Sequence, residues 1–156
     1  MPKTIGVISD THGLLRPEAV AALQGSDLII HAGDIGRLEV IEQLAAIAPI
    51  KAIRGNIDKA AWAEDFPETE VVQADDTLIY VLHNLKELDL EPKAADFRVV
   101  VSGHSHQPKI EEKDGTLYLN PGSAGPRRFK LPIAVGRLII SGTCVSSEIL
   151  PLDIPR

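Results

Sequence analysis

The chain of 156 residues has only one cysteine, Cys144. A single cysteine cannot form an intrachain disulfide, and it also excludes a metal site built from several thiolates. No apolar run approaches the roughly 20 residues needed to cross a bilayer, and residues 1–8 lack the apolar region and cleavage site of a signal peptide. We therefore expect a cytoplasmic protein that does not associate with a membrane.

An excess of positive charge is also absent. The formal net charge is −6 at pH 7, whereas sequence-independent binding to nucleic acid needs a concentrated surface of lysine and arginine. We therefore do not expect a nucleic-acid partner, and a nuclease is disfavoured. A small phosphate-bearing substrate is still compatible with this charge, because a cationic site can lie inside an acidic molecule. The length and the 44% hydrophobic content fit one domain over residues 1–156.

The first third of the chain alternates predicted strands and helices. Each strand leads into a short loop that is rich in Gly, Asp, Asn or His. The predicted strands cover residues 4–8, 27–32 and 50–54, and the predicted helices cover residues 17–23 and 38–48. This alternation is typical of parallel βαβ units.

The pattern changes after Pro67. We predict a strand pair over residues 70–74 and 77–82, a buried strand over 99–101, and short helices over 58–64 and 91–96. From Lys109 onward the chain indicates β-hairpins that turn at Asp114-Gly115 and at Ser141-Gly142. The predicted fold is therefore an α/β fold of two sheets packed face to face, with helices outside.

Seven polar side chains with metal-binding atoms fall at the ends of predicted strands. Alone, each has an ordinary explanation as a turn residue, a helix cap or a core histidine. Together they predict a metal site, because ligands gather beyond the carboxyl ends of strands in α/β sheets, and four of the five histidines are included. The set is Asp10, His12, Asp34, Asn56, His83, His104 and His106.

Seven nitrogen and oxygen ligands are too many for one tetrahedral ion and suit two ions that share a ligand. The four imidazoles disfavour calcium and magnesium, so we expect two divalent ions, Mn²⁺ first, with Ni²⁺, Fe²⁺, Co²⁺ or Zn²⁺ as alternatives. Only Asp10 and Asp34 carry carboxylates. The centre therefore stays electropositive and suits a phosphoester, with a hydroxide between the ions as the nucleophile.

The chain resembles the calcineurin-like metallophosphoesterases, and more narrowly the small bacterial and archaeal phosphodiesterases. The resemblance is carried by Asp10-x-His12, Gly33-Asp34, Gly55-Asn56, His83 and Gly103-His104-Ser105-His106. It implies a four-layer αββα sandwich, a phosphodiesterase activity, and a dimer or tetramer. It also implies that Asp10, His12, Asp34 and His106 bind one ion, and that Asp34, Asn56, His83 and His104 bind the other. The catalytic candidates are Asp34, Asn56 and His104.

Two residues depart from the family pattern. Ile57 stands where many members have a histidine after the Gly-Asn pair, and isoleucine cannot donate a proton to a leaving group. Asn84 stands where the branch has glycine, and we expect the turn to be kept because asparagine tolerates positive φ.

Other polar residues have two interpretations each. His31 either orients a ligand or is a core histidine with a backbone partner. Asn120 and Ser123 belong to an Asn-Pro-Gly-Ser stretch that either forms a simple turn or contacts substrate, and the resembling branch has such a stretch beside its site. Arg127, with Arg128 and Lys130, either binds phosphate or forms a solvated loop. The alternative to an enzyme is a protein-interaction scaffold, because the retromer sorting subunit has a similar fold.

Overall fold

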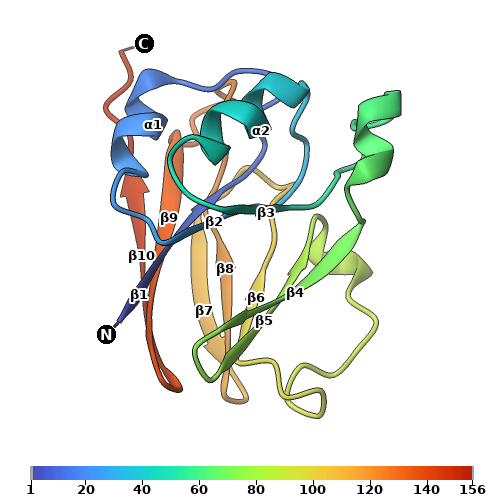
Figure 1. The fold of residues 1–156 in the computed structure, drawn as a ribbon, viewed down its shortest axis with the longest axis vertical. Coiled ribbons are helices and arrows are strands. Elements are labelled where there is room, and N and C mark those ends of the chain that lie inside the picture. The colour runs from blue at the N-terminus through green and yellow to red at the C-terminus, as the bar shows by residue number, and fades with distance from the viewer. Residues whose placement is uncertain (1, 156) are drawn as a thin grey trace.

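The computed structural model describes residues 2–155, and it contains two five-stranded sheets (Figure 1). The first, sheet A, has the order β10-β9-β1-β2-β3. Its strands β1, β2 and β3 are parallel, and β9 and β10 form an antiparallel hairpin beside β1. Their bounds are β1 Lys3–Ile8, β2 Leu28–His31, β3 Ile50–Ala52, β9 Ala134–Ser141 and β10 Cys144–Pro151.

Sheet B has the order β4-β5-β6-β8-β7. The central strands β5, β6 and β8 are parallel, while β4 and β7 pair antiparallel at the edges. The bounds are β4 Thr69–Ala74, β5 Thr77–Leu82, β6 Val99–Val101, β7 Lys109–Lys113 and β8 Thr116–Asn120. Both predicted hairpins are present; the first turns at Asp114-Gly115 as predicted, whereas Ser141 pairs with Cys144, so the second turns one residue later, at Gly142-Thr143.

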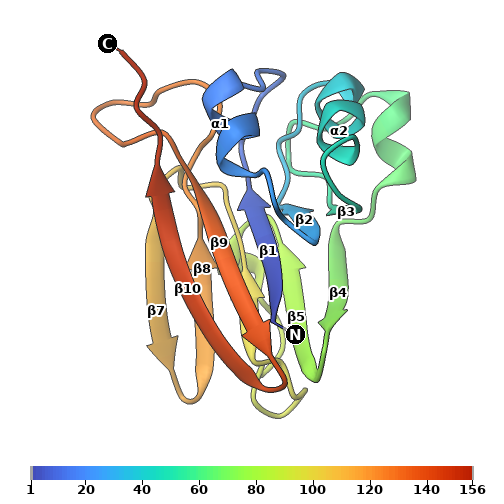
Figure 2. The same cartoon turned by 60° about the vertical axis from the view of Figure 1, so that its left-hand side comes forward.

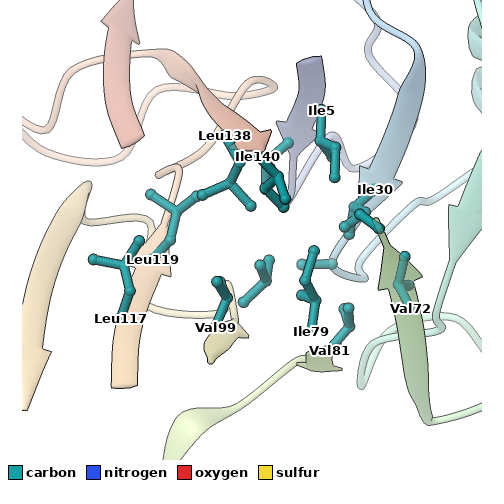
Figure 3. Close-up of a cluster of buried hydrophobic side chains, with 14 of the residues drawn as sticks. Ile5, Ile30, Val72, Ile79, Val81, Val99, Leu117, Leu119, Leu138 and Ile140 are labelled. Atoms are coloured by element: carbon teal, nitrogen blue, oxygen red, sulfur yellow. The ribbon is translucent and has the colours of Figure 1, made fainter. Parts of the chain in front are cut away.

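The hydrophobic core lies between the two sheets (Figure 3). Alternate residues of each strand point inward, so Ile5 and Ile30 of sheet A pack against Ile79 and Val99 of sheet B. All four side chains are fully buried. This face-to-face packing brings the carboxyl ends of β1, β2, β3, β5 and β6 into a common region.

Two helices, α1 (Pro17–Ala22) and α2 (Leu38–Ala45), lie beside β1, β2 and β3 (Figure 2). Leu23 after α1 and Leu44 of α2 pack with Ile8 and Ile29 on the outer face of sheet A. The outer face of sheet B has a thinner cover, in which Phe97 packs on Tyr80 of β5 with ring centroids 5.1 Å apart. The segment before Phe97 contains the 3₁₀-helix η2 (Leu85–Glu87). The predicted αββα sandwich is therefore confirmed, with a reduced helical layer on one side.

Two predicted helices are wrong in detail. Residues 91–96 form turns, because Asp96 adopts a left-handed backbone (φ 67°) that ends the helical hydrogen bonding after one turn. The predicted helix over 58–64 is instead the 3₁₀-helix η1 (Ala61–Asp65), since the carboxyl group of Asp58 is bound by neighbouring loops. In the described part of the chain, no helix has the length and apolar character needed to span a membrane.

Candidate metal centre

Loops that follow five strands meet at one end of the sandwich. The loops after β1 and β2 are joined backbone to backbone: the Asp10 N–H donates to the Gly33 carbonyl at 3.0 Å and the His12 N–H to the Asp34 carbonyl at 2.9 Å. The loop after β6 approaches from sheet B, and the His104 N–H donates to Asp10 Oδ2 at 3.0 Å. The two sheets therefore contribute to one site.

Five of the predicted ligands form a compact cluster. His12 Nε2 lies 3.3 Å from His106 Nε2 and 3.6 Å from Asp34 Oδ2. Asp10 Oδ1 lies 3.4 Å from His106 Nε2 and 3.8 Å from both His12 Nε2 and His83 Nε2. His83 Nε2 lies 3.2 Å from Asp34 Oδ2. The structure thus brings together residues that are up to 96 positions apart in the sequence.

The other two predicted ligands lie at the rim of this cluster. The His104 ring meets the His83 ring edge to face, with centroids 5.2 Å apart. His104 and Asn56 are exposed, and with His83 they line a cavity of about 590 Å³. They are therefore accessible from this cavity.

The backbone at this end is unusual. Five of the seven predicted ligands have positive φ angles, between 48° and 71°, in the left-handed region that side chains other than Asn, Asp and His seldom adopt. Such conformations cost about 1–3 kcal/mol each and concentrate at functional sites. The five are Asp10, His12, Asp34, His104 and His106.

Hydrogen bonds at the back of the cluster orient two of its members. His83 Nδ1 lies 2.8 Å from the Ala32 carbonyl, which can only accept, so Nδ1 carries the proton and the Nε2 lone pair faces the cluster. The Ser9 hydroxyl donates to Asp10 Oδ2 at 2.7 Å, which leaves Oδ1 toward the imidazoles. This arrangement of a fixed tautomer and a held carboxylate is typical of metal ligands.

The Asp34 carboxyl group and the His83 imidazole shift each other's pKa values. Burial by itself raises the pKa of Asp34, but His83, the Ile57 N–H and His12 together outweigh burial and hold the pKa below its usual value. Burial likewise lowers the pKa of His83, but the carboxyl groups of Asp34 and Asp10 and the Ala32 carbonyl raise it above its usual value. The carboxylates therefore favour a cation at this position.

The donor atoms fit divalent ions. Asp10 Oδ1 and His83 Nε2 are buried and lack a hydrogen-bond partner within residues 2–155, a state that costs about 1–3 kcal/mol per atom unless another ligand satisfies it. Two sets of three donors have all their ligand atoms within 4.8 Å: Asp10 with His12 and His106, and Asp10 with Asp34 and His83. Imidazole nitrogen and carboxylate oxygen are donors that first-row transition ions accept.

Asp58 is a structural support of the candidate centre that the sequence analysis missed. It is buried, and its carboxyl group accepts three backbone N–H bonds, from Ile35 and Gly55 to Oδ2 at 2.9 and 2.8 Å and from Gly36 to Oδ1 at 2.9 Å. It therefore ties the loop that carries Asp34 to the loop that carries Asn56. Its position after Gly55-Asn56-Ile57 was the available signal, since a short acidic side chain beside a glycine turn often binds backbone N–H groups.

His31 is a buried core histidine with a backbone partner. Its Nδ1 accepts the Gly33 N–H at 3.1 Å, so its Nε2 carries the proton and donates to Thr11 Oγ1 at 3.0 Å. The Thr11 hydroxyl donates in turn to the Ile35 carbonyl at 2.8 Å. Complete burial lowers the pKa of His31 to about 4, so the ring is neutral at pH 7. It supports the loops rather than contacting a ligand directly.

The residues proposed for substrate contact have structural partners. Asn120 donates to the Gly103 carbonyl and to Ser105 Oγ, both at 3.0 Å. Ser123 is buried, and its hydroxyl donates to the Asp10 carbonyl at 3.0 Å. Arg127 donates to the Ile154 carbonyl at 3.1 Å. Asn120 and Ser123 thus position the candidate ligands, and Arg127 holds the C-terminal segment.

The structure also shows how the two residues that depart from the family pattern are placed. The Ile57 side chain is 44% exposed, and its N–H donates to Asp34 Oδ1 at 3.2 Å. Asn84 does not adopt positive φ, contrary to our expectation (φ −112°). Its side chain instead accepts the Lys86 N–H and caps η2, so glycine is not needed here.

The fold and the cluster together define a two-sheet α/β sandwich with a candidate metal centre at its strand ends. Residues 4–142 match the calcineurin-like phosphoesterase superfamily domain. The chain belongs to this family.

Relatives and solved structures agree with this assignment. A probable metallophosphoesterase of Methanothermobacter thermautotrophicus is 35% identical, covering 97% of this chain and 94% of the relative. A phosphodiesterase of Methanocaldococcus jannaschii is 31% identical, covering 76% of this chain and 82% of the relative. The solved structure of an archaeal phosphodiesterase superposes with a TM-score of 0.77 at 27% identity, covering 94% of this chain and 99% of that one. Vacuolar protein sorting 29 of Cryptosporidium parvum superposes with a TM-score of 0.78 at 20% identity, covering 95% of this chain and 96% of that one. This is a likeness of fold alone.

Proposed function

We propose that this protein is a metal-dependent phosphodiesterase that uses two divalent ions, with Mn²⁺ as the first candidate. The observation that carries the proposal is the cluster of two carboxylates and three imidazoles, with two buried donor atoms facing it unpaired. A small phosphoester is the proposed substrate, and the phosphodiesterase of M. jannaschii among the relatives supports the diester class.

Asp10, His12, Asp34 and His106 would hold one ion, and Asp34, Asn56, His83 and His104 the other. Two divalent ions supply a hydroxide at neutral pH and Lewis-acid stabilisation of charge on the phosphoryl oxygens. The protein's own part is to hold its donors in place. The Ala32 carbonyl fixes the His83 tautomer, and Asp58 fixes the loops of Asp34 and Asn56. His104, at the rim, is the donor best exposed to the substrate side.

The scaffold alternative is supported by the likeness of fold to vacuolar protein sorting 29. A scaffold does not need a metal-dependent rate. We therefore propose to measure the metal content of the purified protein, together with hydrolysis of bis(p-nitrophenyl) phosphate in EDTA and in Mn²⁺, Ni²⁺ or Zn²⁺. We expect two ions per chain and a rate that depends on the metal.

Asp34→Asn tests the shared ligand directly. We expect it to lower the bound metal to one ion or fewer and to reduce the rate by about 100-fold or more, because even residues outside the ligand set change metal sites by about 10–100-fold. The matched control is Asp65→Asn, an exposed acid in η1. Near-normal hydrolysis by Asp34→Asn would contradict the ligand assignment, and the absence of any metal-dependent rate in the wild type would favour the scaffold.

Ile57 leads to a proposal about the leaving group. Because it cannot donate a proton, we propose that the enzyme prefers phenolate leaving groups and turns over alkyl monoesters weakly. Ile57→His, at a half-exposed position, should raise the rate on a matched alkyl ester relative to bis(p-nitrophenyl) phosphate by about tenfold or more. Equal wild-type rates on the two substrates would contradict the proposal.

A further inference from the structure

Two cavities of about 590 Å³ each open beside the candidate metal centre. We name them the Tyr80 cavity and the Tyr118 cavity after an aromatic residue in the lining of each. Both include His104 and Asn84 in their lining, so they meet at the rim of the centre. A phosphodiester bound at the centre would therefore extend one substituent into each cavity.

The Tyr80 cavity is the more acidic of the two. Its cations are Arg54 and Lys59, and its lining also includes three carboxylates, from Glu68, Glu87 and Asp89. Arg54 is already engaged, because it donates to the Phe66 carbonyl at 2.6 Å and pairs with Glu68 at 3.3 Å. This cavity therefore offers little attraction to a second anion.

The Tyr118 cavity has the opposite charge. Lys86, Lys109 and Arg128 line it with a single carboxylate, Glu111, which pairs with Lys109 at 3.2 Å. Within residues 2–155, Lys86 and Arg128 form no ion pair with an acidic side chain. Two uncompensated cations thus lie beside the centre of a chain whose net charge is −6.

The same cavity also has an apolar surface. Tyr118 is half-buried on β8, and Leu85, which is 40% exposed, also lines the cavity. An exposed aromatic or aliphatic surface next to cations suits a nucleobase with a phosphate, since base stacking on an aromatic ring contributes about 1–3 kcal/mol. A simple inorganic anion would leave this surface unused.

We propose that the Tyr118 cavity binds the arm of a nucleotide diester that carries a terminal phosphate in addition to the scissile one, with Lys86 and Arg128 as the residues that select it. This inference rests on the proposed phosphodiesterase function and names the substrate class more closely. If this is correct, the enzyme distinguishes between diesters by the charge that one of their two substituents carries.

The test compares two dinucleotides, ApA and pApA, which differ only by a terminal phosphate. We expect wild-type kcat/KM to favour pApA by about five- to tenfold, because each exposed cation contributes at most a few-fold. Lys86→Ala combined with Arg128→Ala should reduce this preference to less than about twofold. The control pair, Lys93→Ala with Lys113→Ala, removes the same charge at exposed lysines that line neither cavity and should keep the preference.

A wild-type preference near one would overturn the inference, as would an equal loss in the control pair. A second measurement does not need catalysis: NMR titration of the protein in EDTA with ApA and with pApA. We expect pApA to bind several-fold more tightly, and only the Lys86/Arg128 pair of substitutions to remove the difference. If no metal supports any hydrolysis, the proposed function fails while this titration still decides the inference.

Discussion

The two sheets build their halves of the candidate centre in different ways. In sheet A, the loops after β1 and β2 are joined by three backbone hydrogen bonds, and the third runs from the Gly13 N–H to the Ile35 carbonyl at 2.8 Å. In sheet B, the loop after β6 is held by the Gly103 N–H on the His83 carbonyl and by the side chain of Asn120. Both carboxylates come from the sheet A half, and three of the four candidate imidazoles come from sheet B.

This difference indicates how function and stability are coupled in each half. The sheet A loops are buried and depend on one another, so a change that moves a ligand there should also lower the free energy of unfolding. The sheet B loop is more exposed, and besides single N–H bonds to His83 and Asp10 it is held by the side chain of Asn120. A change there should weaken metal binding with a smaller effect on stability.

Asp58→Ala should have the largest effect on the sheet A half. It leaves three backbone N–H groups without their acceptor, and we expect the free energy of unfolding to fall by about 3 kcal/mol or more. Metal affinity should fall by about 10–100-fold, because the loops of Asp34 and Asn56 lose their common support. Urea denaturation in EDTA and a Mn²⁺ titration measure the two quantities.

Glu64→Ala provides the control for Asp58→Ala, because Glu64 is an exposed acid in η1. It should change the free energy of unfolding by no more than about 0.5 kcal/mol. A stable Asp58→Ala protein with normal metal affinity would show that the sheet A loops keep their geometry without this clamp.

The pH dependence of the free energy of unfolding should reveal the buried, neutral His31 that supports the loops of the sheet A half. The pKa of His31 is about 4 in the folded chain against 6.5 for the free side chain, so the unfolded chain takes up the proton first as the pH falls. The stabilisation is present above pH 6.5 and is lost between pH 6.5 and 4, a change of about 3 kcal/mol. His31→Asn does not titrate, so the stability difference between wild type and variant should narrow by this amount between pH 7 and pH 4.

Urea denaturation in EDTA at both pH values measures this difference and avoids contributions from metal release. Other titrating groups, including Asp34 and His83, are present in both proteins and cancel in the comparison to first order. A stability difference that stays constant with pH would mean that His31 is not held neutral by burial.

Asn120→Ala should have the smallest effect on stability. It removes two donated hydrogen bonds to the loop of His104, and a half-exposed side chain of this kind contributes about 1 kcal/mol. We expect metal affinity to fall by about tenfold. Gln73→Ala, at an exposed position in β4, is the control. A stability loss as large as that of Asp58→Ala would remove the distinction between the two halves.

Much of this architecture was predictable from the sequence. Strands that end in Gly-Asp, Gly-Asn or Ser-Gly-His fix where polar side chains emerge, and the parallel β1, β2 and β3 place those ends together. The convergence of Asp10, Asp34 and His106 follows from that rule together with the family resemblance. The assignment of each ligand to a particular ion stays a prediction.

Other features depend on contacts that no local pattern encodes. Asp58 binds N–H groups up to 23 positions away, and Gly103 must be small because a Cβ atom there would lie 2.6 Å from Asp10 Oδ2 across the gap between the sheets. The predicted helix over 91–96 is wrong because Asp96 has a left-handed backbone. Aspartate adopts this conformation more readily than most residues, but the periodicity of apolar residues does not indicate it.

The left-handed backbone at five candidate ligands has a consequence for substitutions there. Glycine adopts this conformation without steric cost, so replacing His12 or His106 by glycine would relax the metal-free chain while deleting a donor. Glycine would therefore fit the backbone at these positions better than the aspartate and histidine side chains do, at the expense of the donor atoms that a metal ion needs.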